Sequence, residues 1–82
     1  MTDASREAIA AVQHEIWSHW MEYMFGVCKQ NDDGSMTIPA DKVNRWTRQA
    51  QTYYAYLTEL EQESDRHQAD KVLRVLQEVT HD

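Results

Sequence analysis

Cysteine, proline and glycine are scarce in this sequence: its 82 residues include one cysteine, one proline and two glycines. Because Cys28 has no second cysteine to pair with, the disulfide-stabilised class of small secreted domains is excluded, and a reducing, cytoplasmic location is expected. No apolar run approaches the ~20 residues that cross a bilayer, and the first residues lack the basic and apolar segments of a signal peptide. We expect no membrane association.

Positive charge is also in short supply, since 8 Lys and Arg stand against 14 Asp and Glu, for a formal net charge of −6. That sign repels a phosphate backbone, so we expect no direct binding of nucleic acid. The imbalance is uneven: residues 1–38 carry 2 basic and 6 acidic side chains, and residues 39–82 carry 6 and 8. An acidic surface favours a basic protein partner.

The chain is short enough that residues 1–82 are expected to form one helical domain. A domain of this size buries only ~60% of the surface that its unfolded chain exposes, so its core is marginal unless a second chain adds buried surface. A homodimer is therefore expected.

The scarcity of helix-breaking residues predicts an all-α fold of three helices, interrupted by a Gly/Asp turn at residues 30–38. A long first helix is expected over about 3–29, capped by Thr2 or Asp3, and a short extended piece over 35–38. Pro39 suits the first position of a second helix, which runs to about residue 51. Thr58 and Glu61 have the spacing of a capping box, so a third helix is expected from there to about residue 79.

Apolar residues recur at helical spacing in the first and third of these helices. The stripe of the first helix comprises Ile9, Val12, Ile16, Trp20, Met24 and Val27. The stripe of the third comprises Leu60, Ala69, Val72, Leu73, Leu76 and Val79.

The first helix has more apolar material than one stripe needs, because Trp17, Trp20, Met21, Tyr23, Met24 and Phe25 fall within nine residues. Two explanations are open: the other helices cover both faces, or the surplus forms a surface for a second copy or another protein. We favour the second explanation. The predicted interface consists of Trp17, Trp20, Tyr23 and Met24.

Positive charge gathers in the second helix, where Lys42, Arg45 and Arg48 recur every three residues and give residues 39–57 a net charge of +2. Beside aromatic side chains these cations suit a planar anion such as a nucleotide. The predicted site for this alternative consists of Arg45, Arg48, Tyr54 and Arg66. The competing interpretation is a solvated basic face that pairs with nearby carboxylates.

Signals for catalysis or a metal are weak. Glu15, His19 and Glu22 share a helical face but have no supporting motif, and the segment around Gly34 lacks the acidic residues that begin and end a calcium loop. Cys28 has no neighbouring base and is expected to be an inert, buried thiol. We expect no enzyme activity, no metal and no cofactor.

Several short motifs resemble those of a group of short uncharacterised proteins of bacteriophages and bacteria. They are Trp17-Ser18-His19-Trp20-Met21, Ile38-Pro39, Arg45-Trp46, Arg48-Gln49 and Ser64-Asp65-Arg66. Small phage proteins often sequester a host protein or a signalling nucleotide, so this resemblance implies a phage accessory or inhibitor.

Residues 54–66 are similar to the end of the ryanodine-receptor repeat domain, with Tyr54, Leu57, Glu61, Glu63, Asp65 and Arg66 in register. The resemblance implies ligand binding in larger assemblies. In physical terms these residues start a helix, so Tyr54 is expected to pack on that helix and Asp65 or Arg66 to pair with another element.

Taken together, these patterns predict a non-enzymatic binding module that engages a protein through an acidic, aromatic-rich helical surface. The alternative is a small-ligand module that binds a nucleotide or another phosphorylated molecule.

Overall fold

A computed structural model describes residues 3–80 and confirms the all-α fold with its three helices. The elements are α1 (Asp3–Val27), β1 (Lys29–Gln30), β2 (Met36–Thr37), α2 (Ala40–Ala50), the 3₁₀ turn η1 (Tyr54–Tyr56) and α3 (Glu59–Thr80). The predicted cap at Thr2 lies outside the described residues.

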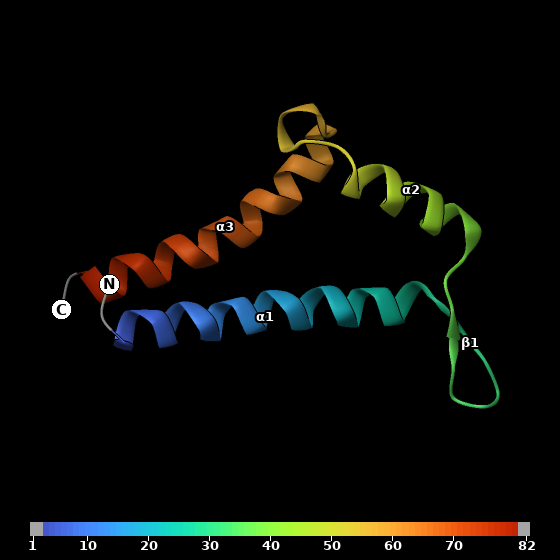
Figure 1. The fold of residues 1–82 in the computed structure, drawn as a ribbon, viewed down its shortest axis with the longest axis horizontal. Coiled ribbons are helices and arrows are strands. Elements are labelled where there is room, and N and C mark those ends of the chain that lie inside the picture. Colours follow the sequence, from blue (N-terminus) through green and yellow to red (C-terminus); the bar gives the residue numbers. More distant parts are fainter. Residues whose placement is uncertain (1–2, 81–82) are drawn as a thin grey trace.

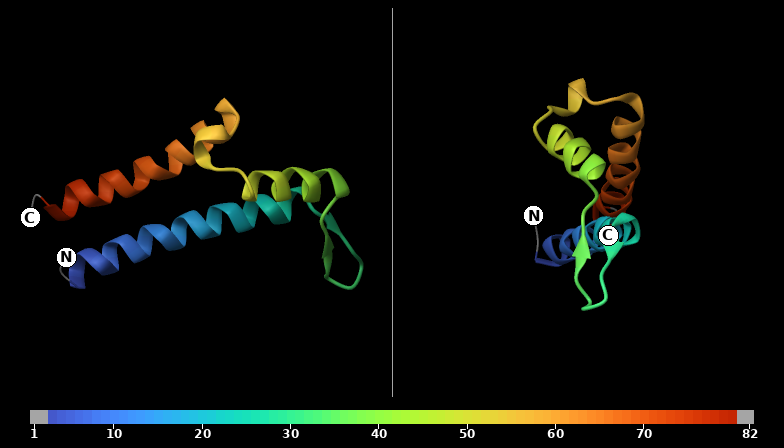
Figure 2. Two further views of the ribbon diagram at one scale, coloured as in Figure 1. Left: turned by 45° about the horizontal axis from the view of Figure 1, so that its top comes forward. Right: turned by 90° about the vertical axis from the view of Figure 1, so that its right-hand side faces the viewer.

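Helices α1 and α3 form an antiparallel pair that is closest where α1 begins and α3 ends (Figure 1). Toward the other end the two helices diverge, and α2 lies over the second half of α1 (Figure 2). The result is elongated, with extents of 49 × 34 × 16 Å and a radius of gyration of 16.3 Å. A compact domain of this length would have a radius of gyration of about 12 Å.

The predicted turn forms the loop of a two-stranded hairpin, and β2 lies within the predicted extended piece 35–38, whereas β1 was not expected. Lys29 pairs with Thr37 and Gln30 with Met36, so α1 ends at Val27 and Lys29 belongs to a strand. Local hydrogen bonds close the loop: the Asn31 side-chain amide donates to the hydroxyls of Ser35 and Thr37, each at 3.0 Å. Gly34 adopts a φ of +91°, the left-handed backbone that glycine allows without strain. Helix α2 then begins at Ala40, with Pro39 one residue earlier than predicted, at the N-cap.

The core is very small. Among the described residues, Val12 is the one buried hydrophobic side chain, at 5% exposure. The rest of the predicted stripe on α1 is half-buried, except for Trp20, which is exposed. The chain exposes 6688 Å², whereas a compact monomer of 9.7 kDa would expose about 5,100 Å². The fold therefore leaves about 1,600 Å² more surface in water than a compact domain of its mass.

The structure corrects the stripe predicted for α3, because Leu60, Ala69 and Leu73 are exposed. Leu60 precedes Glu61, and successive helix residues point about 100° apart. Since Glu61 is turned inward, with 5% exposure, Leu60 faces the solvent.

One polar side chain within α3 is buried with an oxygen that accepts no hydrogen bond. The Gln68 side-chain oxygen is the one buried side-chain polar atom in residues 3–79 without a hydrogen-bond partner. Such a group costs roughly 1–3 kcal/mol of stability.

Gln68→Met should therefore raise the free energy of unfolding by about 1 kcal/mol, because methionine fills a similar volume without an unpaired oxygen. Chemical denaturation at a fixed protein concentration measures this change. Gln51→Met, at an exposed position, is the matched control and should change stability little. A Gln68→Met protein less stable than the original would show that the amide contributes favourably.

Candidate docking groove

An open groove lies where α1, α2, η1 and the start of α3 meet. Its volume is about 600 Å³ and most of its lining is apolar. It is lined by Trp20, Met21, Tyr23 and Met24 from α1, by Trp46, Gln49 and Ala50 from α2, and by Thr52, Tyr54, Leu57 and Asp65. This volume is within the range of about 300–1,000 Å³ that is usual for binding pockets.

Aromatic rings connect the two helical walls of the groove. Trp20 and Tyr23 on α1 meet edge to face with ring centroids 6.1 Å apart, and Tyr23 meets Trp46 of α2 at 6.5 Å. Trp20 and Tyr23 remain exposed, and Trp46 is half-buried. Aromatic rings bury large apolar areas at little entropic cost, so this wall is suited to hold an apolar side chain.

The Glu61 carboxylate holds α2 against the start of α3. One of its oxygens accepts a hydrogen bond from the Thr58 backbone N–H at 3.1 Å, and the Glu61 N–H donates to the Thr58 hydroxyl at 3.2 Å. This pair confirms the predicted capping box. The other carboxylate oxygen accepts from the Arg48 guanidinium at 2.5 Å. The hydrogen bonds from Arg48 and Thr58 lower the pKa of Glu61 below its ordinary value.

The segment between α2 and α3 is fixed by further hydrogen bonds. The Thr52 hydroxyl donates to the Arg48 carbonyl at 2.6 Å, and the Gln62 side-chain amide donates to the Tyr54 carbonyl at 2.9 Å. Tyr54 is therefore bonded to α3, which agrees with the expectation that it packs on that helix. These contacts place the Tyr54 ring in the groove while its neighbour Tyr53 stays outside.

The structure brings most of the predicted interface together. Trp20, Tyr23 and Met24 all line the groove. Trp17 does not; it lies exposed one turn earlier on α1, stacked on His14 with ring centroids 5.8 Å apart.

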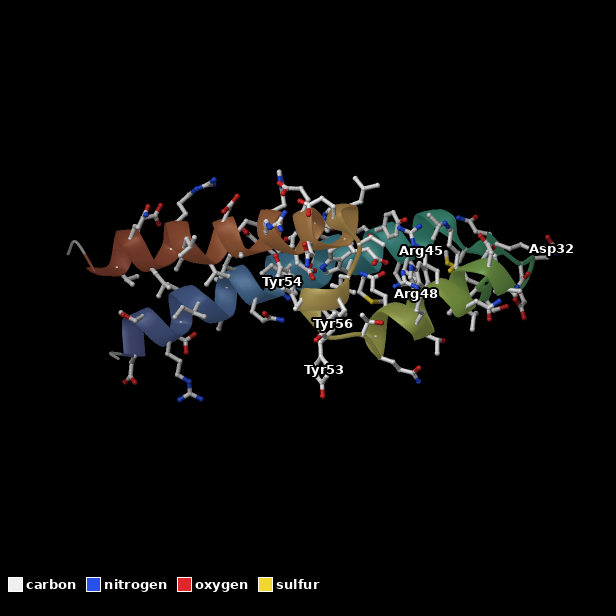
Figure 3. The ribbon with its side chains drawn as sticks, turned by 90° about the horizontal axis from the view of Figure 1, so that it is seen from above. Asp32, Arg45, Arg48, Tyr53, Tyr54 and Tyr56 are labelled. Atoms are coloured by element: carbon white, nitrogen blue, oxygen red, sulfur yellow. The ribbon has the colours of Figure 1, made fainter. Side chains whose placement is uncertain are left out.

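The four residues of the predicted anion site are not gathered in one place. Arg48 is paired with Glu61, and Arg66 donates to Glu59 at 2.8 Å and Glu63 at 3.0 Å. Figure 3 shows Arg45 and Arg48 close to each other, with Tyr54 set apart from them along the molecule. The hydrogen bonds that Arg66 donates to Glu59 and Glu63 raise the pKa of Arg66, and a smaller contribution comes from the side chain of Tyr54, so Arg66 stays charged within α3. Among these three arginines, Arg45 alone forms no ion pair with the described residues.

Most of the groove was not predicted: of its lining residues, Trp20, Tyr23 and Met24 belonged to the predicted interface and Tyr54 to the predicted anion site. Gln49, Ala50, Thr52, Leu57 and Asp65 were not predicted to belong to it. The spacing of Trp46, Gln49 and Ala50 marks one face of α2, which was the available signal. No pattern indicated that this face would meet the aromatic half of α1, because that depends on the angle between the helices.

The described part of the chain holds no metal cluster and no membrane-spanning helix. Within residues 3–80, no three His, Cys, Asp or Glu side chains gather closely enough to hold a metal ion, and Glu15, His19 and Glu22 lie exposed on α1. No helix in this range has a stretch both long and apolar enough to cross a membrane. Cys28 is half-buried, next to the end of α1, and carries a free thiol.

Comparisons of the chain with protein-family models, with curated proteins and with solved structures find no match. Its function is therefore inferred from the residues and the geometry of the groove.

The Glu61 junction should make stability depend on pH. Because the pKa of Glu61 is lowered from its ordinary value of 4.5, its contribution is complete above that value and is lost as the pH falls through the folded-state pKa. Glu61→Gln keeps an oxygen for Thr58 but loses the charge that attracts Arg48. We expect this variant to melt at a lower temperature at neutral pH and to lose less stability on acidification.

Thermal melts between neutral pH and acid measure both effects. The control is Glu78→Gln, which removes the same charge from an exposed position of α3. Equal pH profiles for the original protein and the Glu61→Gln variant would mean that the junction contributes nothing to the acid transition.

Proposed function

We propose that this protein is a non-enzymatic protein-binding module that acts as a homodimer and holds an apolar segment of another protein in its aromatic groove. The observation that carries the proposal is an open, mainly apolar groove with partly exposed Trp20, Tyr23 and Tyr54 in its walls. Partly exposed tryptophan and tyrosine beside a hollow are the residues that most often carry the binding energy of protein interfaces.

The chemistry of the lining favours binding over catalysis. Asp65 is the one carboxylate among the lining residues, and the lining includes no His, Cys, Lys or Arg. General acid–base or nucleophilic catalysis needs such a group next to a second one that activates it. The groove has apolar walls against which a ligand can pack, but its lining does not place His, Cys, Lys or Arg next to Asp65.

The partner segment is expected to be an amphipathic helix with basic flanks. Helices are recognised in grooves through apolar residues at positions i, i+3, i+4 and i+7. Asp65 in the lining and the net charge of −6 would attract Lys and Arg at the edges of that helix. A phage inhibitor that blocks a basic surface of a host protein would work in this way, and this role remains a prediction from the resemblance.

A displayed library of helical peptides, selected against the full chain, tests the groove. We expect the selected peptides to carry apolar anchors at helical spacing with basic flanks. Met24→Gln should weaken their binding by about tenfold or more, because a polar amide replaces an apolar wall. Fluorescence polarisation with one labelled peptide measures the affinity.

Two matched controls separate the groove from the rest of the surface. Met36→Gln makes the same change in the hairpin, and Tyr53→Ala removes a ring that is 82% exposed, whereas Tyr54→Ala removes a groove ring that is 47% exposed. The controls should leave the affinity nearly unchanged, and Tyr54→Ala should lower it. Peptides that bind the Met24→Gln and Tyr54→Ala variants as well as the original protein would refute the groove as the docking site.

The anion-binding alternative has less support, because a phosphate would have to displace Glu61 from Arg48 and Glu59 and Glu63 from Arg66. We expect a panel of nucleotides to leave the melting temperature unchanged. Any ligand that binds only the folded state raises it by mass action. A rise that disappears in Arg45→Ala would favour the alternative.

A further inference from the structure

The surface that this chain exposes in excess of a compact monomer is comparable to the surface that one subunit of a permanent dimer buries. Its accessible surface of 6688 Å² exceeds that of a compact monomer by about 1,600 Å². Permanent homodimers bury about 1,000–2,500 Å² on each subunit. Val12 is the one buried hydrophobic side chain among the described residues. The α1/α3 pair therefore needs further apolar surface from another chain to form a stable core.

The two flanks of the α1/α3 pair differ in character. On one flank a small hollow of about 240 Å³ is lined by Ala8, Ala11, Val12 and Val75 together with three charged side chains, those of Glu15, Lys71 and Arg74. The opposite flank is the one that continues from the aromatic groove, since Trp20 of α1 and Asp65 of α3 both line that groove. An apolar partner surface would therefore be expected on the groove flank.

Helical spacing places exposed apolar residues along that second flank. On α3, Ala69 and Leu73 follow Asp65 at successive intervals of four residues, so they lie on the same side of that helix as Asp65. On α1, Trp17 precedes Trp20 by three residues and lies on the same side as Trp20. Both helices therefore continue this flank away from the groove. Because α1 and α3 are antiparallel, one turn back along α1 from Trp20 and one turn forward along α3 from Asp65 lead in the same direction along the helix pair. Trp17, Ala69 and Leu73 thus form an exposed apolar strip, which we call the Trp17 strip.

We propose that a second copy of this chain covers the Trp17 strip, so that two α1/α3 pairs pack flank to flank as a four-helix bundle. Such a contact uses the same strip on both chains, related by a two-fold axis. A second copy is the occupant that the exposed area favours, because a core too small to be stable alone needs a partner that is present whenever the chain is made. The inference rests on the homodimer of the proposed function and places its interface beside the groove, on a separate set of residues.

The net charge of the chain predicts how dimerisation should depend on salt concentration. Two chains of net charge −6 repel each other, whereas the strip itself is apolar. Salt screens that repulsion, so dimerisation should strengthen as salt is added. Binding of a basic peptide in the groove should weaken under the same conditions.

Sedimentation equilibrium of the full chain, with helix content followed by circular dichroism on the same samples, tests the proposal. We expect a mass twice the 9.7 kDa of one chain, with mass and helix content falling together on dilution. Leu73→Gln and Trp17→Gln should each raise the dimer dissociation constant by about tenfold or more. Leu60→Gln is the matched control: Leu60 is 84% exposed on the same helix, compared with 54% for Leu73, and lies off the strip.

A wild-type chain that is fully helical at 9.7 kDa would overturn the dimer without affecting peptide binding in the groove. A wild-type dimer that survives Leu73→Gln and Trp17→Gln unchanged would overturn the assignment of its interface to the strip. If Leu73→Gln loses its helices altogether, Leu73→Met decides, because it keeps an apolar side chain and should retain both helix and dimer. Loss of helix in Leu73→Met as well would leave Trp17→Gln to decide, because Trp17 is 55% exposed: a Trp17→Gln dimer as tight as the original would contradict the proposal.

Discussion

The Glu61 carboxylate determines how the parts of this chain are held together. It completes the hydrogen bonds at the start of α3 through Thr58 and holds α2 through Arg48. Between these attachments the chain turns through η1, which sets Tyr54 into the groove. The Arg48–Glu61 ion pair is the one salt bridge between α2 and α3 in the described residues, and it acts with the hydrogen bonds of Thr52 and Gln62 to set how these two helices are joined. The groove lies where they are joined.

A second constraint is the shortage of core. The antiparallel pair of α1 and α3 buries one hydrophobic side chain among the described residues and leaves aromatic rings in water. In a longer chain additional helices would cover these rings. The uncovered area includes the groove, which we propose holds a helix of another protein, and the Trp17 strip, which we propose is covered by a second copy. Both proposals follow from the small number of buried hydrophobic side chains.

Much of the fold could be predicted from local chemistry. The capping box of Thr58 and Glu61 was predicted because its two hydrogen bonds involve residues three apart. Strand β1 was missed because Lys29 and Gln30 become a strand only by pairing with Met36 and Thr37. Of the groove, the aromatic residues of α1 were identified by their abundance, whereas Leu57 and Asp65 were not, because nothing near them in the sequence indicates what lies opposite.

The sequence by itself determined the number of helices, the capping box of α3 and the excess of aromatic side chains on α1, because these depend on composition and on spacings within a few residues. Tertiary structure alone decided that Arg48 of α2 is paired with Glu61 of α3, whereas Arg66 is paired with Glu59 and Glu63 of its own helix, so that these basic residues stabilise the fold instead of forming one open site. It also decided which aromatic rings face a groove and which lie on the open flank. Those outcomes depend on the angles at which the helices cross, and these are fixed by contacts between residues distant in the chain.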